Sequence, residues 1–301
     1  MSQPAPVVVG VDGSEEALAA VTWAAGEAEL MGRPLRVVHA AKWGDFPMRF
    51  GSPPKPPEWS GLADVVQQVV AEAEQHARKS RPGLEVTGEA IDGFVRPVLL
   101  AEANEAALMV VGSRGLGGVG SVLIGSIGVE LAARAACPVV VVPHGPTAEP
   151  DAEIVVGVDC SDSSRPAAEF AFAEAHRRGV SVVVTMAWEG PGRHADSRDE
   201  EPPAEHEATR QTAQKRLDAF VEPLRKEYPG VVAHVGVRFA TARTFLAERA
   251  EHAGMLVVGS RGYGAARGLF MGSVSQAALH HAPCPVAVVP FTALVDETPE
   301  D

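Results

Sequence analysis

The positions with the clearest chemistry in this chain form a glycine-rich pattern that occurs twice. Gly112–Gly115 follows an apolar run, nine residues intervene, and Gly125-Ser126 comes next. The same intervals separate Gly259–Gly262 from Gly272-Ser273. Glycine tolerates a left-handed backbone and leaves no Cβ in a ligand's way, and a helix that begins at Gly-Ser points free N–H groups at an anion. The repeated spacing therefore predicts two sites for nucleotide phosphates.

An aspartate is the second candidate, because it follows the first apolar run of each copy. Val9–Asp12 recurs as Val156–Asp159. Ligands of an open doubly wound sheet bind beyond the carboxyl ends of its strands, where the strand order reverses, so the aspartate and the glycine loop should share one edge. The carboxylate of Asp12 could bind a ribose or an adenine edge, help to place a metal ion on a phosphate, or merely cap the next helix. Its recurrence as Asp159 favours binding.

These motifs belong to two copies of a whole domain. Arg96 recurs as Arg243, and Cys137–Val139 recurs as Cys284–Val286, with the same offset of 147 residues that relates the two glycine patterns. A constant offset from the first strand to the last indicates a duplicated domain rather than a short repeated motif. The polar, proline-rich segment 144–150 predicts the boundary, and we expect domains at residues 1–146 and 147–301.

Within each copy, short apolar runs alternate with amphipathic segments. The predicted strands are 7–11, 35–40, 85–91, 108–111 and 139–142, then 154–158, 180–186, 232–238, 255–258 and a closing strand. The predicted helices run from Ser14 to a stop at Gly32, then 62–79 (with Val65, Val66, Val69, Val70 and Ala73 on its inner face), 96–105, about 126–135, 163–177, 204–227, 243–252 and a closing helix. Segments 44–57 and 189–203 are interpreted as irregular excursions. The alternation predicts an α/β fold with right-handed crossovers and a parallel sheet covered on both faces.

Three motifs together resemble the universal stress protein family, and in particular its tandem, ATP-binding, actinobacterial type. They are Val-Gly-Val-Asp-Gly-Ser at the start, Gly-x2-Gly-x9-Gly-Ser after a Val-Val strand, and Cys-Pro-Val-x-Val-Val-Pro at the end. The resemblance covers both halves outside the two excursions. It implies two five-stranded, doubly wound, Rossmann-like (HUP-like) domains, each binding ATP, with Mg²⁺, so that the phosphates lie on the glycine loop and the strand-one aspartate lies near the adenosine. Carried over by position, the implied binding residues are Asp12, Ala40, Gly112, Gly115, Gly125, Ser126, Asp159, Met186, Gly259, Gly262, Gly272 and Ser273.

The second copy departs from the first at the positions that should surround the ligand. Cys160 stands where the first copy has glycine, which predicts crowding or a lost left-handed conformation, and Met186 replaces the smaller Ala40. Family members often carry an aspartate just before strand four, where this chain has Ala107 and Gly254. We therefore expect the second site to bind nucleotide more weakly.

Composition and charge limit the other functions. The net charge of −13 over 301 residues argues against a general binder of nucleic acid or anionic membrane. Three cysteines are too few for a disulfide framework, no apolar run approaches a membrane span, and the start of the chain lacks the pattern of a signal peptide. We expect a cytoplasmic protein whose two halves pair pseudo-symmetrically, with a homodimer possible and the protein partner unknown.

Other motifs do not hold in both copies. Gly115–Gly120 spells Gly-x-Gly-x-x-Gly, but it follows the fourth strand, and Arg267 interrupts it in the second copy. The chain lacks the Gly-Lys-Ser/Thr of a P-loop. His280-His281 with Cys284 is not repeated, so we expect no metal site there, and His39 is interpreted as packing or pocket wall. Arg114 and Arg261 could reach phosphate or solvent.

Three classes of function remain open. The first is a nucleotide-dependent regulator of stress adaptation or growth. The second is a slow ATP-hydrolysing or nucleotidyl-transferring enzyme, for which the sequence offers no repeated general base beyond the two aspartates. The third is a protein-interaction scaffold with vestigial sites. The first is favoured, and no catalytic residue is assigned.

Overall fold

The computed structural model describes residues 4–41, 58–114, 125–145, 152–188, 207–261 and 271–291. The strands of the first half are β1 Val7–Gly10, β2 Leu35–Ala41, β3 Val86–Asp92, β4 Leu108–Gly112 and β5 Val139–Val142. Its helices are α1 Glu15–Met31, α2 Glu58–Ser80, α3 Val95–Glu105 and α4 Ser126–Arg134. The strands of the second half are β6 Ile154–Gly157, β7 Val182–Trp188, β8 Ala233–Phe239, β9 Met255–Gly259 and β10 Val286–Val289. Its helices are the 3-10 turn η1 Asp162–Ser164, α5 Arg165–Arg178, α6 Glu207–Glu227, α7 Ala242–Ala250 and α8 Ser273–His281.

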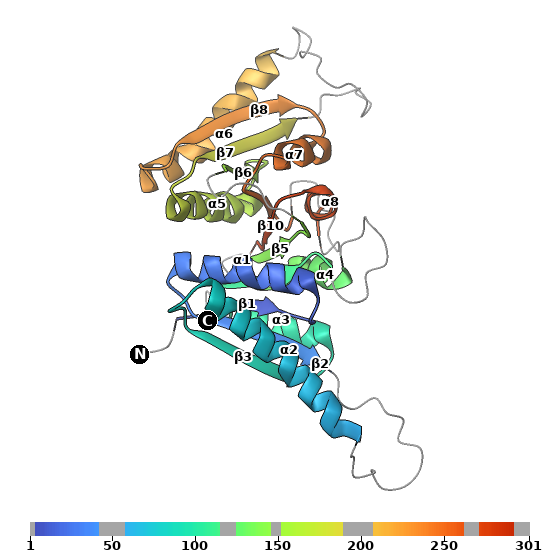
Figure 1. Cartoon of the computed structure of the whole chain (residues 1–301). Helices are drawn as coiled ribbons and strands as arrows, with labels where there is room; N and C mark the ends of the chain where they lie inside the picture. Colours follow the sequence, from blue (N-terminus) through green and yellow to red (C-terminus); the bar gives the residue numbers. More distant parts are fainter. Residues whose placement is uncertain are drawn as a thin grey trace, which may run out of the picture.

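One continuous ten-stranded sheet runs through both halves, in the order β3-β2-β1-β4-β5-β10-β9-β6-β7-β8 (Figure 1). Strand pairs within each half are parallel, as predicted, whereas β5 and β10 pair antiparallel where the halves meet. Val140 faces Ala287, which is its own counterpart in the repeat, and the flanking pairs are reciprocal. A self-complementary pairing of this kind is typical of a two-fold axis. The expected pseudo-symmetric pairing of the halves therefore runs through their last strands.

Two helical layers cover the sheet, as the alternation predicted. Helices α1, α2, α5 and α6 pack on one face and α3, α4, α7 and α8 on the other. In β1, Val7 and Val9 point into the first layer and Val8 into the second, and all three are at most 1% exposed. Each fully buried valine contributes about 1.5–3 kcal/mol, so both faces of the strands hold the sheet between the layers.

Local signals set the first helix as expected. Ser14 is the N-cap of α1, and its hydroxyl accepts a hydrogen bond from the Ala17 backbone N at 3.2 Å. Gly32 ends the helix in the left-handed region with φ +61°. Both predictions are confirmed because they depend on residues adjacent in sequence.

Several predicted details are wrong. Val65 is 56% exposed, because the buried stripe of α2 follows Val66, Val70, Ala73 and Ala77 instead. The helix predicted over 163–177 is divided, and the α-helical part begins only at Arg165, where Pro166 occupies the first turn. The strand predicted over 180–186 is shifted to 182–188. The excursions 44–57 and 189–203 lie outside the described residues.

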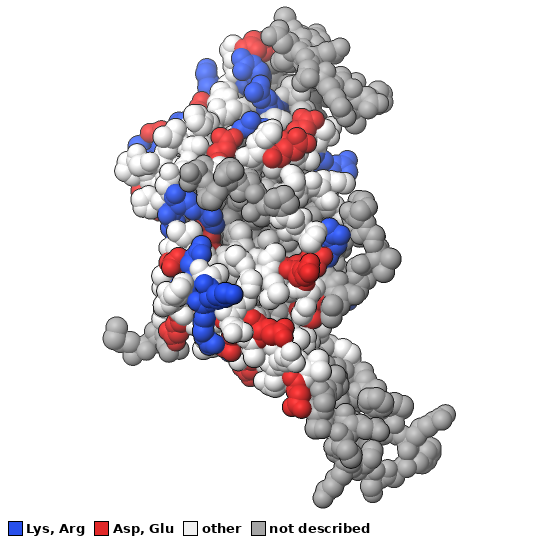
Figure 2. All heavy atoms as spheres, in the orientation of Figure 1, with Lys and Arg blue, Asp and Glu red and all other residues white. Residues whose placement is uncertain are grey.

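The surface and the helices give two further facts. On the face seen in Figure 2, acidic and basic side chains of the described residues are interspersed. Within the described ranges, no helix is both long enough and apolar enough to cross a membrane.

Candidate functional site

The candidate site lies where β1 and β4 separate at their carboxyl ends. β1 pairs with β2 on one side and with β4 on the other. The strand order therefore reverses at β1, because the chain first adds strands on the β2 side and later adds β4 on the opposite side. Gly10 is in register with Val111, which brings the turn at Asp12 and the start of the glycine loop to the same edge. The second half repeats this arrangement between β6 and β9. The prediction that both motifs share one edge at a reversal of strand order is confirmed.

A tight turn fixes the carboxylate of Asp12. Its Oδ1 accepts hydrogen bonds from the Ser14 backbone N at 3.0 Å and from the Ser14 hydroxyl at 2.6 Å. Gly13, between them, has φ +88°, a conformation that L side chains rarely adopt. Because Ser14 is the side chain that caps α1, the alternative of Asp12 as a simple helix cap is wrong. Asp12 instead orders the turn at the switch point.

The second half makes the same turn with a cysteine. Asp159 Oδ1 accepts hydrogen bonds from the backbone N and the hydroxyl of Ser161. Cys160 has φ +57°, so the left-handed conformation is retained, at a cost of about 1–3 kcal/mol for a residue with a Cβ. Its thiol lies 3.8 Å from the sulfur of Met186, and burial raises the pKa of that thiol. The expected loss of the left-handed conformation is therefore wrong, and the Cys160 side chain instead contacts Met186.

The ends of each glycine loop are held together by backbone hydrogen bonds. The Gly125 N–H donates to the Ser113 carbonyl at 2.8 Å, and the Gly272 N–H donates to the Ser260 carbonyl at 3.0 Å. A Cβ on Gly112 would lie 3.0 Å from the carbonyl oxygen of Glu16, so a glycine is needed where β4 passes the first turn of α1. Each loop thus leaves and re-enters the same point of the sheet edge.

The helix after each loop begins as predicted. α4 begins at Ser126 and α8 at Ser273, and glycine is the N-cap residue of both helices. Since glycine has no side chain to cap the first turn, the N–H groups there suit an external acceptor. Gly115 and Gly262 lie outside the described residues.

The base-side candidates lie on the second strand of each half. His39 donates from its Nδ1 to the Val11 carbonyl at 2.7 Å, which ties β2 to the end of β1 beside Ala40. Thr185, the counterpart of Val38 in the strand register, is 4% exposed and donates to the Gly236 carbonyl at 3.3 Å. The register makes Met186 the counterpart of His39 and Ala187 that of Ala40, so the expected exchange of Ala40 for Met186 is wrong. The interpretation of His39 as pocket wall fits this contact.

Sequence reasoning missed Arg96 as a member of the site. Its guanidinium lies 3.4 Å from the Ser126 hydroxyl and forms an ion pair with Glu130 at 2.9 Å. The signal was present, because this arginine recurs as Arg243. The second half has Ala277 at the position of Glu130, so the arginine there lacks that ion pair.

Two tandem, doubly wound halves with a glycine loop at each switch point define a Rossmann-like α/β protein. Comparison with known proteins narrows this class. The model of the universal stress protein family matches residues 5–143 and 152–290, and the chain belongs to that family.

Similar proteins match this chain over nearly its whole length. One universal stress protein of Mycobacterium tuberculosis is 37% identical over 298 residues, covering 94% of this chain and 96% of the relative. A second protein of the same organism is 35% identical over 297 residues and covers 94% of each chain. The crystal structure of a universal stress protein from Archaeoglobus fulgidus, at 20% identity, superimposes with a TM-score of 0.66 over 95% of this chain and 96% of that one. The last comparison supports the fold.

Proposed function

We propose that this protein binds ATP with Mg²⁺ at both switch points and acts in the cytoplasm as a nucleotide-dependent regulator of stress adaptation or growth. Each site would belong to one domain, 1–146 or 147–301. The observation that carries the proposal is the convergence of the Asp12 turn and the start of α4 at one edge of the sheet. That edge is where doubly wound sheets bind ligands.

The first half offers a complementary group for each part of the nucleotide. The phosphates would lie at the start of α4, on Gly112, Gly125 and Ser126, where backbone N–H groups and the helix dipole favour negative charge. Arg96, beside Ser126, adds a positive charge at the same place. The adenosine would lie between Asp12 and the backbone of Ala40.

Five residues of the second half are proposed for the second nucleotide. They are Asp159, Met186, Gly259, Gly272 and Ser273, with Gly115 and Gly262 completing the two loops.

The available donors fit Mg²⁺ rather than a metal held by the protein alone. The switch point of the first half offers the carboxylate of Asp12 and the hydroxyls of Ser14 and Ser126, which are oxygen ligands. Over the described ranges, no three His, Cys, Asp or Glu side chains gather into a metal site. Mg²⁺ commonly keeps several waters and relies on one or two carboxylates plus the phosphates of its nucleotide. Asp12 is therefore the group that would hold it, and the ion would offset the charge of the phosphates.

Mass spectrometry of protein denatured directly after purification tests the proposal. We expect ATP to be released from the wild-type protein and to be lost from the double variant Asp12→Ala, Asp159→Ala. Glu222→Ala, on the exposed side of α6, is a matched control that should retain it. ADP in place of ATP would favour the enzyme hypothesis, and release of no nucleotide, together with no binding of added ATP, would favour the scaffold.

A further inference from the structure

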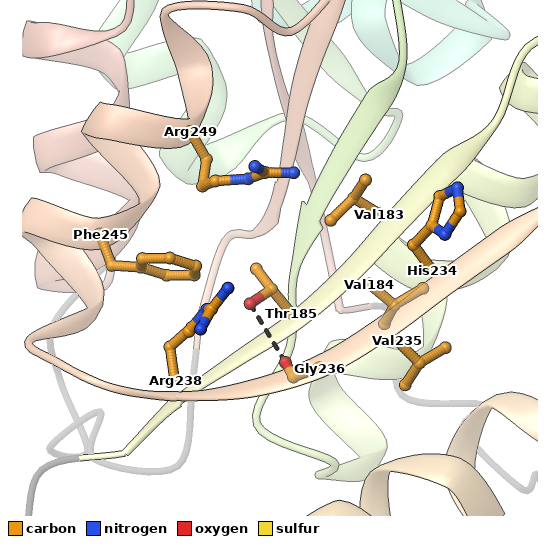
Figure 3. Close-up of a pocket in the computed structure, with 9 residues that line it drawn as sticks. All are labelled: Val183, Val184, Thr185, His234, Val235, Gly236, Arg238, Phe245 and Arg249. Carbon is orange, nitrogen blue, oxygen red and sulfur yellow. Dashed lines mark hydrogen bonds between the residues drawn. The ribbon is translucent and has the colours of Figure 1, made fainter. Parts of the chain in front are cut away.

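A pocket of about 220 Å³ lies in the second half, between α7 and the sheet (Figure 3). Strands β7 and β8 form its floor, and one side of α7 forms its wall. Nine residues line it: Val183, Val184, Thr185, His234, Val235, Gly236, Arg238, Phe245 and Arg249. Successive residues of a strand point to opposite faces, so Thr185 faces this pocket, whereas Met186 packs on the opposite face with the α5 and α6 layer. None of the nine lining residues belongs to the Asp159 turn or to the ends of the glycine loop, so the pocket and the proposed nucleotide site share no residue.

The pocket is open above Gly236. A Cβ built on Gly236 would meet no heavy atom within 4 Å, so the space over this part of β8 is empty of protein. The Thr185 hydroxyl lies at its edge and donates to the Gly236 carbonyl at 3.3 Å. The floor thus has a polar group and room for a ligand group in direct contact with the strand.

The charge of the lining is positive. Arg238 rises from β8 toward Thr185, and Arg249 extends from α7 across the pocket, with the ring of Phe245 beside them (Figure 3). The guanidinium of Arg249 forms an ion pair with the carboxylate of Glu153, which does not line the pocket, at an N–O distance of 2.8 Å. Arg238 has no hydrogen bond or ion pair with any residue that the structure describes. His234 is the third basic side chain, and none of the nine lining residues is acidic.

In the first half, the equivalent position between the helix and the sheet is occupied by a cluster of charged side chains. There Arg36 forms ion pairs with Glu102 of α3 at 2.6 Å and with Glu89 of β3 at 2.7 Å. The repeat places Val183 at the position of this arginine and Gly236 at the position of Glu89.

The charge at the helix position of this cluster is reversed, because the second half has Arg249 where the first half has Glu102. The second half has therefore lost both carboxylates of this cluster and gained a cation on the helix. The pocket of the second half therefore contains two guanidinium groups at the location where the first half has two carboxylates paired with an arginine.

We propose that this pocket binds a small organic anion, a carboxylate or phosphate monoester attached to a flat apolar group. The anionic end lies between Arg238 and Arg249, because guanidinium groups match the geometry of carboxylate and phosphate oxygens. The apolar end contacts Phe245 and Val183. A volume of about 220 Å³ is below the range of roughly 300–1,000 Å³ for drug-sized pockets, so the ligand is smaller than a nucleotide.

Calorimetric titration with phenyl phosphate tests the proposal on the full chain. The titration is done with saturating ATP and Mg²⁺, so that the probe does not report on the glycine loops. We expect one saturable site per chain. Arg238→Gln should weaken binding by about tenfold or more, because a charge-assisted hydrogen bond is lost. Arg238 is exposed, so this variant should fold normally.

A second variant rebuilds the cluster of the first half. The triple change Val183→Arg, Gly236→Glu, Arg249→Glu should fill the pocket with its own ion pairs and abolish binding. Lys226→Gln, which removes one positive charge from the opposite helical layer, should leave binding unchanged. The proposal would be overturned if wild-type protein showed no saturable binding, or if Arg238→Gln bound phenyl phosphate as tightly as Lys226→Gln does. Neither outcome depends on whether ATP binds at the switch points.

Discussion

Glu27 of α1 and Glu174 of α5 are counterparts in the repeat, and they meet at the junction between the two halves. Their residues are 1% and 0% exposed, and Arg178 donates hydrogen bonds to both carboxylates. Figure 1 shows the two helices side by side where the halves join. Two buried carboxylates therefore share one guanidinium at the centre of the molecule, with Arg177 bound to Glu174 as well.

This pair should make the stability of the protein depend on pH. Burial, followed by the negative charge of Glu174, raises the pKa of Glu27 from 4.5 to about 8, although Arg178 opposes the shift. The folded protein then holds more protons than the unfolded chain between these two values, so stability is highest at the acidic end of the window and falls as pH rises through it. The slope should reach about 1.4 kcal/mol per pH unit.

Urea unfolding at a series of pH values measures this slope. Glu27→Gln should flatten it, because an amide does not titrate. Glu29→Gln, on the exposed side of the same helix, should keep the wild-type slope. Equal slopes for Glu27→Gln and the wild type would show that Glu27 does not carry the dependence.

Arg178 should be a major stabilising residue of the junction. Arg178→Met installs the residue that the first half has at this position, Met31, and leaves the two buried carboxylates without their shared partner. We expect a loss of about 3 kcal/mol or more in the free energy of unfolding above pH 8, where both carboxyl groups are ionised, because breaking a buried ion pair strands a charge.

Arg81→Met is the comparison for that substitution. Arg81 pairs with Glu29 at 2.9 Å near the surface, and such pairs contribute about 1 kcal/mol or less. Urea denaturation compares the two variants, and similar losses would contradict the special role of the buried cluster.

A carboxylate in the glycine loop should abolish nucleotide binding at its own site. Gly115→Glu in the first half, or Gly262→Glu in the second, adds a negative charge to the segment proposed to hold phosphates. Equilibrium dialysis with labelled ATP should show about half the wild-type stoichiometry for each single variant and none for the double variant, while the circular dichroism spectrum stays unchanged. Full binding by the double variant would refute the phosphate-loop assignment.

The two nucleotide sites should differ in affinity. Both halves make the aspartate turn, but the Cys160 side chain lies against Met186 at the second turn, whereas Gly13 places no side chain at the first. A difference of about 1 kcal/mol corresponds to several-fold in the dissociation constant. Calorimetric titration of nucleotide-stripped protein should show two sites, and Asp12→Ala should remove the tighter one. If the tighter site disappeared with Asp159→Ala instead, the order of the two halves would be reversed.

The sequence by itself determined the features that depend on neighbouring residues and on the repeat. The constant offset between the motifs predicted two equivalent domains, and the alternation of apolar runs with amphipathic segments predicted parallel sheets between helical layers. The cap at Ser14 and the helix start at Ser126 were predictable, because capping involves only the next few residues. Even the shared edge of Asp12 and the glycine loop followed, since parallel strands end on the same side.

Only the tertiary structure decided which distant side chains meet. The pairing of β5 with β10, the cluster of Glu27 with Arg178, and the contact of Arg96 with Ser126 join residues whose separation along the chain carries no local signal. The pocket above Gly236 depends on substitutions in two strands and a helix at once. Val65 illustrates the same limit, because helical spacing predicts a stripe but the position of the sheet decides which side of the stripe is buried.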